Sequence, residues 1–119
     1  MPSTTRFKIG DIVSVQFPYS DLQGNKRRPG LVLHADEKDL LLARITTRAP
    51  LASSDVPLAH WTKSGLPRAS TIRLTKLACI DQGLIHHKVG RLHPADATAV
   101  IQAMEIWVRN LSTELSASE

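Results

Sequence analysis

Apolar and polar residues alternate over several short stretches before residue 93, a pattern typical of half-buried β-strands. Residues 11–17 place Val13, Val15 and Phe17 on one face of such a strand and two polar side chains on the other. Residues 29–34 begin with a proline, which a strand tolerates at its first position, and continue as an apolar run. The pattern therefore predicts one strand in each of these two segments.

Further strands are predicted from less regular patterns. Residues 39–47 are apolar on both faces at first and polar at the end, as in an interior strand that emerges towards solvent. Residues 70–75 alternate, with the threonines and the arginine directed outwards. Residues 76–81 continue this strand with an uncertain phase, as a β-bulge would allow. Another short strand is expected within residues 84–92.

Two segments between these strands are rich in turn-forming residues. Residues 18–28 contain Pro, Ser, Asp, Gly and Asn, and are predicted to form an exposed loop. Residues 48–69 hold three of the seven prolines and are predicted to be mostly loop, with room for a short strand at residues 55–59. The length of the second segment makes it a candidate functional loop.

The period changes at Pro94 to the three- and four-residue spacing of an amphipathic helix, and Pro94 with Asp96 suits a helix start. The apolar positions that share one face of this helix are Ala97, Val100, Ile101, Met104, Trp107, Val108 and Leu111. We expect a C-terminal helix of about five turns that lies with this stripe against the sheet. The tail, residues 112–119, is expected to fray.

These elements predict a mainly β fold with a C-terminal α-helix. Five to seven short strands followed by one helix favour a small, strongly bent sheet or barrel with the helix packed on it. The 119 residues are 42% apolar and 22% charged, which fits a single domain over residues 1–119 with its core at about 9–112 and frayed ends. No apolar stretch approaches the roughly 20 residues of a membrane span, and no signal-peptide core is present, so we expect a soluble, cytoplasmic protein.

Positive charge is concentrated in the middle of the chain. Residues 26–91 contain 12 Lys and Arg against 5 Asp and Glu, whereas residues 92–119 contain 1 against 4. Nine of the 15 cations are arginine, which binds phosphate and carboxylate in a bidentate manner and stacks on bases. The distribution favours a polyanion or an acidic protein as partner, with a merely solvated basic surface as the alternative.

Cysteine and histidine give little support for metal or cofactor chemistry. Cys79 is the single cysteine, cannot form an internal disulfide and is expected to serve in packing. His86 and His87 are adjacent, so on a strand they would face opposite sides, and no zinc-ligand spacing is present. His34 and His60 could each act as a base, although such residues are more often structural. Nucleotide-binding glycine motifs are absent as well. Because neither metal-ligand spacing nor nucleotide motifs are found in the sequence, we expect no metal and no cofactor.

Three adjacent cations, Lys26, Arg27 and Arg28, lie where the first loop becomes a strand. Arg28 is thereby held on rigid backbone while its guanidinium group can still reach solvent, as a catalytic or phosphate-binding cation requires. Neighbouring cations repel each other, so an anion nearby would explain the cluster. A solubilising hairpin without a ligand is the alternative.

Two more positions combine arginine with threonine. Arg44 and Thr46 share a face of the predicted strand, and Arg73 lies between Thr71 and Thr75 on its own face. Threonines at strand ends are often simple β-formers. Together with Arg28, however, these neighbourhoods would suit a site that binds phosphate and needs no metal.

Several sequence blocks, taken in order, resemble the PemK/MazF family of toxins from bacterial type II toxin–antitoxin systems. They are GDIVSVQFPYSDLQGNKRRPGLVLH at 10–34, LLARITT at 41–47, WTKSGLPRASTIRLTKLACID at 61–81 and KVGRL at 88–92. The resemblance runs from about residue 9 to residue 111 and rests on the order of the blocks more than on any single one.

The resemblance implies a small SH3-like β-barrel of the MazF/CcdB/Kid kind with a C-terminal helix, usually assembled as a homodimer. It implies an endoribonuclease that cleaves single-stranded RNA at short sequences without a metal. It also implies a cognate antitoxin protein as partner. An acidic, partly disordered antitoxin peptide in a basic groove would complement the positive charge in the middle of this chain.

By the same resemblance, Arg28 and Thr46 are the expected catalytic pair, and Arg73 matches an arginine that some members use. Thr75 stands where the family can carry an acidic residue, which puts an acid–base role there in doubt. The first loop often carries a His or Glu in the family, whereas here it offers Ser20, Asp21 and Gln23, so the general base stays open. Further expected RNA contacts are Lys26, Arg27, Arg44 and Thr47.

Two other functions remain open at this point. The same fold serves toxins that poison DNA gyrase through a tryptophan near the end of the chain, whereas Trp107 lies on the predicted buried stripe. A barrel that binds RNA or a partner without catalysis is the other alternative. Trp61, in the long loop, could stack on bases or anchor the loop to the barrel, and the second role is favoured.

Overall fold

The computed structural model describes residues 6–16 and 27–117. Five residues with sequence-based roles lie outside these ranges, and their roles stay predictions: Phe17, Ser20, Asp21, Gln23 and Lys26. Nearly all of the first predicted loop falls in the same gap.

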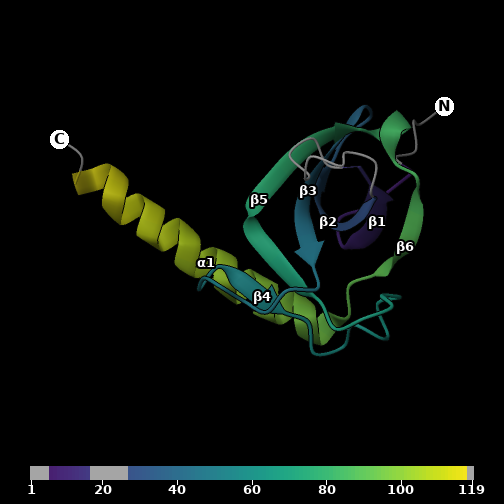
Figure 1. Cartoon of the computed structure of the whole chain (residues 1–119). Helices are drawn as coiled ribbons and strands as arrows, with labels where there is room; N and C mark the ends of the chain where they lie inside the picture. The colour runs from purple at the N-terminus through teal and green to yellow at the C-terminus, as the bar shows by residue number, and fades with distance from the viewer. Residues whose placement is uncertain (1–5, 17–26, 118–119) are drawn as a thin grey trace.

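The described chain forms strands first and one long helix last (Figure 1). The elements are β1 (Asp11–Val15), β2 (Arg28–Ala35), β3 (Asp39–Thr46), β4 (Asp55–Pro57), β5 (Thr71–Asp81), the short 3₁₀-helix η1 (Gln82–Leu84), β6 (His87–Arg91) and α1 (Pro94–Ala117). Each strand expected from the sequence is present. The short strand predicted inside the second loop is β4, and Pro29 is the second residue of β2.

All six strands join in one antiparallel sheet with the order β4-β5-β3-β2-β1-β6. The sheet curves strongly, so that β5 and β6 lie on opposite sides of the rounded body in Figure 1. The predicted mainly β fold is confirmed. Within the described residues, β4 and β6 are both edge strands, so of the two expected forms, a strongly bent sheet or a barrel, the structure shows the bent sheet.

A large bulge divides the pairing of β3 with β5. Ala43 pairs with Leu77, but the next residue, Arg44, pairs with Arg73, so the register of β3 with β5 skips residues 74–76. This bulge explains the uncertain phase that the sequence showed after residue 75. Because a bulge bends and twists a strand, the two halves of β5 can run in different directions and follow the curvature of the sheet.

Apolar clusters cover both faces of the sheet. The first, under α1 and the long loop, contains Ile12, Leu31, Ala43, Ile45, Val56, Leu58, Leu66, Ile72, Leu74, Leu92 and Val100. The second, on the concave face, contains Phe7, Val13, Val15, Val32, Leu40, Leu42, Ala78 and Ile80. Because β1 lies between the two clusters, Ser14 is buried, contrary to the expectation of a polar face, whereas Gln16, just after β1, is exposed as expected. Thr71, expected to face outwards, is buried as well.

Cys79 does not pack in either cluster. It lies between Ala78 and Ile80, which face the concave cluster, and alternation along the strand directs its own side chain to the exposed side. The expectation of a packing role for Cys79 is therefore wrong.

Helix α1 is anchored at its N-terminal end by a buried carboxylate. Asp96 is 3% exposed and accepts hydrogen bonds from the backbone N–H groups of Ala59 (3.0 Å) and His60 (2.9 Å). The ring of His60 stacks on that of His93 with centroids 4.0 Å apart. Trp61 packs against the first cluster, which supports its role as an anchor of the loop.

The rest of α1 departs from the prediction. Ala97, Val100 and Met104 contact the first cluster as expected, but the helix then runs past the sheet (Figure 1), and Val108 and Leu111 are 53% and 44% exposed. Ile101, also expected on the buried stripe, is 57% exposed. Of the stripe, only Ala97, Val100 and Met104 contact the cluster, and Trp107 is half-buried. The helix also continues to Ala117 instead of fraying from residue 112.

The extension of α1 agrees with local propensity, because its last turns contain neither proline nor glycine and include leucine, glutamate and alanine, which favour helix. No helix in the described part of the chain is long and apolar enough to cross a membrane.

We predict that Asp96→Ala lowers the free energy of unfolding by about 2–4 kcal/mol, because hydrogen bonds to charged groups contribute about 1.5–3 kcal/mol each and the buried N–H groups would lose their acceptor. Urea denaturation measures the change. Thr98→Ala is the matched control, since the Thr98 hydroxyl donates to Pro94 O at an exposed site of the same helix and its loss should cost less than about 0.5 kcal/mol. Equal effects of the two substitutions would contradict the anchoring role of Asp96.

Candidate active site

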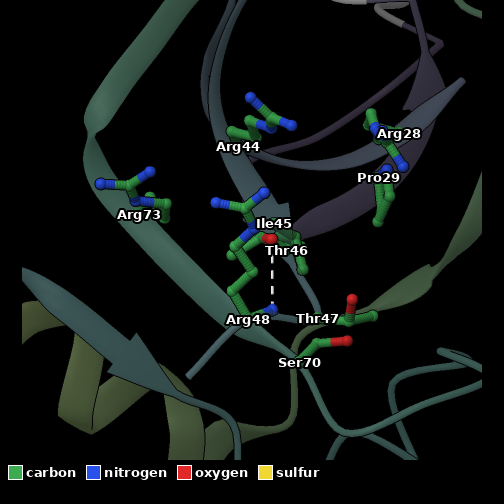
Figure 2. Close-up of a pocket in the computed structure, with 9 residues that line it drawn as sticks. All are labelled: Arg28, Pro29, Arg44, Ile45, Thr46, Thr47, Arg48, Ser70 and Arg73. Carbon is green, nitrogen blue, oxygen red and sulfur yellow. Dashed lines mark hydrogen bonds between the residues drawn. The ribbon is translucent and has the colours of Figure 1, made fainter. Parts of the chain in front are cut away.

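Four arginines line one pocket at the end of the sheet where β2 begins and β3 ends: Arg28, Arg44, Arg48 and Arg73. Arg44 and Arg73 are directly paired across β3 and β5, so their side chains leave the same face of the sheet. Figure 2 shows the four guanidinium groups arranged around the pocket. We name it the arginine pocket; its volume is about 470 Å³.

Hydroxyl groups complete the lining. Thr47 and Ser70 lie at the lower side of the pocket in Figure 2, and Thr46 lies near the centre of the view. Thr46 Oγ1 accepts a hydrogen bond from the backbone N–H of Arg48 at 3.3 Å. The pairing of Gly30 with Arg44 brings the start of β2 beside the end of β3, so Arg28 and Thr46 meet at the same end of neighbouring strands. The pocket therefore offers both cationic donors and neutral hydroxyl donors.

Arg73 is held in place by a buried carboxylate. Its Nε lies 3.5 Å from Asp55 Oδ1, and the Asp55 side chain is only 2% exposed. Burial alone would raise the pKa of Asp55, but hydrogen bonds from the backbone N–H groups of Leu51 and Ala52, together with the charge of Arg73, lower it below the usual value. Asp55 is thus ionised at neutral pH and fixes one side of the Arg73 guanidinium group.

The described lining includes four arginines and no carboxylate. Arg28, Arg44 and Arg73 are half-buried, whereas Arg48 is exposed. Half-buried cations on rigid strands interact with an anion more strongly than cations in bulk water do, because the effective dielectric constant is lower. Arginine also donates two parallel hydrogen bonds to phosphate oxygens. The lining therefore has the positive charge and the hydrogen-bond donors that binding a phosphate group would require.

Most of the residues singled out in the sequence come together here. Arg28, Arg44, Thr46, Thr47 and Arg73 all line the arginine pocket.

Other candidates lie elsewhere. Arg27 is exposed before β2 and is not part of the described lining. It lies near His86, whose pKa is lowered first by desolvation and then by the charges of Arg27 and His87. Thr75 is exposed beside the bulge, and His34 and His60 do not line the pocket. Within the described ranges, no three His, Cys, Asp or Glu side chains are grouped as metal ligands.

Four lining residues were not predicted from the sequence: Pro29, Ile45, Arg48 and Ser70. Arg48 could have been found, because it is a cation two positions after Thr46 and the chain turns there. Ser70 gave no such signal, since only the pairing of β3 with β5 brings it to the pocket.

A model of the family described as PemK-like, MazF-like toxin of type II toxin–antitoxin system matches residues 8–108. No curated protein matches the chain significantly.

Solved structures of similar fold include a Mycobacterium tuberculosis toxin, MazF-mt6, with 21% identity, a TM-score of 0.63 and coverage of 78% of this chain and 90% of that one. Another is a mycobacterial endoribonuclease in complex with its cognate antitoxin, with 15% identity, a TM-score of 0.64 and coverage of 91% and 93%. At these identities the likeness shows the fold. The family match, by contrast, spans β1 to β6 and the first half of α1, and it shows that the chain belongs to the PemK/MazF family of toxins of type II toxin–antitoxin systems.

Proposed function

We propose that this protein is the toxin of a type II toxin–antitoxin system and that it cleaves single-stranded RNA as a metal-independent, sequence-specific endoribonuclease. The observation that supports this most directly is the arginine pocket, in which four arginines and three hydroxyl side chains surround a space suited to a phosphate group. Family membership supports the same conclusion.

In the proposed reaction, the ribose 2′-oxygen attacks the adjacent phosphorus. A bond forms between the 2′-oxygen and phosphorus while the bond from phosphorus to the 5′-oxygen of the next nucleotide breaks. The 2′-hydroxyl proton goes to a base, and the leaving 5′-oxygen takes up a proton. The products are a 2′,3′-cyclic phosphate and a free 5′-hydroxyl, with no water consumed.

Arg28 has the central role in this proposal, because negative charge grows on the non-bridging phosphoryl oxygens in the transition state and a preorganised cation stabilises it there. It could also protonate the leaving oxygen indirectly. Thr46 orients the phosphate through its hydroxyl group. Since Arg28 and Thr46 come from neighbouring strands, their separation is fixed by the sheet rather than by a loop.

The remaining cations hold the rest of the RNA backbone. Arg73, fixed by Asp55, and Arg44, directly opposite it, are placed to bind flanking phosphates. Arg27 and Lys26, which precede Arg28 in the sequence, are further proposed RNA contacts. The identity of the proton acceptor stays open; the first loop offers Ser20, Asp21 and Gln23 in the sequence.

The proposed partners are a cognate antitoxin and a second copy of the chain. A solved neighbour of the same fold is bound to its cognate antitoxin, and an acidic antitoxin segment would complement the arginine pocket here. For self-association, α1 offers exposed apolar side chains from Ile101 onwards, among them Ile101, Val108 and Leu111. A contiguous exposed apolar surface of this kind is typical of protein–protein contacts.

We predict that Arg28→Ala lowers the cleavage rate about a hundredfold or more, because a central charge-stabilising donor is lost. The measurement is cleavage of a mixed-sequence RNA in excess chelator, with the ends mapped for cyclic phosphate and 5′-hydroxyl. Arg109→Ala, an exposed arginine on α1 outside the arginine pocket, is the matched control and should cleave at the wild-type rate. Cleavage by Arg28→Ala at nearly the wild-type rate would refute the assignment. Wild-type protein that folds but does not cleave would favour a gyrase target or a binding-only role.

We predict that Arg73→Ala reduces the salt dependence of RNA binding. Each phosphate contact to a single strand contributes about 0.7 to the slope of log K against log salt concentration, so the slope should fall by about 0.7. The affinity of a non-cleavable 2′-deoxy-substituted oligonucleotide, measured at several salt concentrations, gives this slope. Arg109→Ala should leave the slope unchanged, and an unchanged slope for Arg73→Ala would show that Arg73 contacts no phosphate.

We predict that Val108→Glu shifts the protein from dimer to monomer, because a buried charge without a partner is strongly unfavourable at an apolar interface. Analytical ultracentrifugation over a range of protein concentrations measures the mass. Gln102→Glu adds the same charge at an exposed position of α1 outside the apolar stripe and should leave the dimer intact. A monomeric wild-type protein at all concentrations would contradict the proposal.

A further inference from the structure

A second hollow lies beside the arginine pocket, and three residues, Pro29, Thr47 and Ser70, line both. We name it the side pocket; its volume is about 400 Å³. The residues that distinguish it from the arginine pocket include Ser14, Leu66, Pro67, Arg68, His87 and Val89. Because the two hollows share a wall, a ligand whose phosphate sits in the arginine pocket can extend directly into the side pocket.

The chemistry of the side pocket differs from that of its neighbour. Leu66, Pro67 and Val89 give it apolar walls, and Arg68 is the single arginine or lysine in its described lining, compared with four in the arginine pocket. A hollow of this size and polarity lies within the range of about 300–1,000 Å³ found for small organic ligands. It therefore suits a flat, uncharged ring better than a second phosphate.

Polar groups lie where such a ring could be recognised. Ser14 pairs with His87 on β6 and with Pro29 on β2, so the three residues form a row on one face of the sheet that leads to the arginine pocket. His87 is exposed, and its imidazole ring meets that of His86 edge to face, with centroids 4.9 Å apart. The exposed ring can stack on a base or bond with a base edge. The Ser14 hydroxyl can donate or accept a hydrogen bond.

The long loop forms one wall of the side pocket, and close contacts between its backbone and that of β6 hold this wall in place. Gly90 has no room for a side chain, because a Cβ atom there would lie 2.0 Å from the carbonyl oxygen of Ser64. Gly65 adopts a φ of +88°, and a Cβ atom on it would lie 2.5 Å from Val89 O. Two glycines thus allow the long loop to lie directly on β6.

Hydrogen bonds fix the same loop from its other side. The Ser64 hydroxyl accepts from the backbone N–H of His93 at 3.2 Å, and Leu66 N–H donates to Trp61 O at 3.1 Å. Asp96 accepts two further hydrogen bonds from the same loop, from the backbone N–H groups of Ala59 and His60. A wall fixed in this way loses little conformational entropy when a ligand binds, which is the advantage of a preorganised site.

From these observations we infer that the side pocket binds a nucleobase of the RNA, adjacent to the phosphate held in the arginine pocket, and that it helps to determine the sequence cleaved. The inference rests on the proposed function in taking RNA as the ligand. Phosphate contacts position RNA without reading its sequence, whereas an unstacked base in a shaped pocket is read by stacking and by its edges. The arginine pocket supplies the first kind of contact and the side pocket the second.

The test measures base preference by binding, without cleavage. The probes are the four nucleoside 3′,5′-bisphosphates and, as a reference without a base, ribose 3,5-bisphosphate, each titrated by calorimetry. At least one nucleotide should bind the wild-type protein about 5- to 150-fold more tightly than the reference, as expected for stacking of one base. His87→Ala should reduce this preference fivefold or more, whereas its neighbour His86→Ala, which does not line either pocket, should keep it.

A second variant fills the hollow. Val89→Phe should abolish the preference for a base while leaving the affinity for ribose 3,5-bisphosphate within about twofold of wild type. Circular dichroism shows whether Val89→Phe folds. If it does not, His87→Ala decides the question, because a substitution at an exposed position should leave the fold intact. The absence of any base preference in the wild type, or its equal loss in His86→Ala and His87→Ala, would overturn the inference.

Mapping the cleavage sites of the same proteins separates this inference from the proposed function. Base preference without cleavage by the wild type would refute the endoribonuclease and leave the base pocket standing. Cleavage at identical sequences by His87→Ala and His86→Ala, together with binding that ignores the base, would refute the base pocket and leave the endoribonuclease standing.

Discussion

The bulge between β3 and β5 is the constraint on which the rest of the structure depends. By moving the pairing from Ala43 with Leu77 to Arg44 with Arg73, it bends the longest strand of the sheet in the middle. The C-terminal half of β5 then covers the concave cluster, while Ile72 and Leu74 in its first half join the cluster under α1. The same shift sets Arg73 opposite Arg44, so the geometry of the arginine pocket follows from the way the sheet is bent.

Placing four arginines around one space has an electrostatic cost, because like charges repel more strongly where water is partly excluded. Asp55 offsets part of this cost for Arg73, and the hydrogen bonds from Leu51 and Ala52 keep Asp55 ionised. The strands supply the remaining rigidity through their own packing. A bound phosphate would reduce the repulsion between the arginines further. Binding of the proposed ligand would therefore raise the stability of the folded protein.

The sequence predicted the elements well because each left a local signal. Alternation marked the strands, Pro29 marked the start of β2, and Pro94 with Asp96 marked the start of α1. It also paired Arg44 with Thr46 correctly, since residues two apart on a strand share a face. The catalytic assignment of Arg28 and Thr46 came from family resemblance rather than from these patterns.

What the sequence could not predict depended on contacts between distant segments. An apolar stripe on a helix shows that something covers it but not what, so the exposed half of α1 looked identical to the buried half. Ser14 looked like a residue of a polar face because nothing local reveals a second layer beneath β1. Ser70 reaches the arginine pocket only through strand pairing, and the side pocket exists only because Gly65 and Gly90 let a loop lie on β6.

The two pockets rest on different kinds of structure, and this difference bears on how specificity could change among toxins of this fold. The arginine pocket is built mainly on strands, where a substitution disturbs pairing on both sides. One wall of the side pocket belongs instead to the loop before β5, and loops tolerate change better than the strands they connect. Substitutions at exposed positions such as Pro67 or Arg68 could alter the base that fits without moving the phosphate. If the two pockets have their proposed roles, the chemistry of cleavage and the choice of sequence can vary separately, because the sheet fixes the arginine pocket and the loop shapes the side pocket.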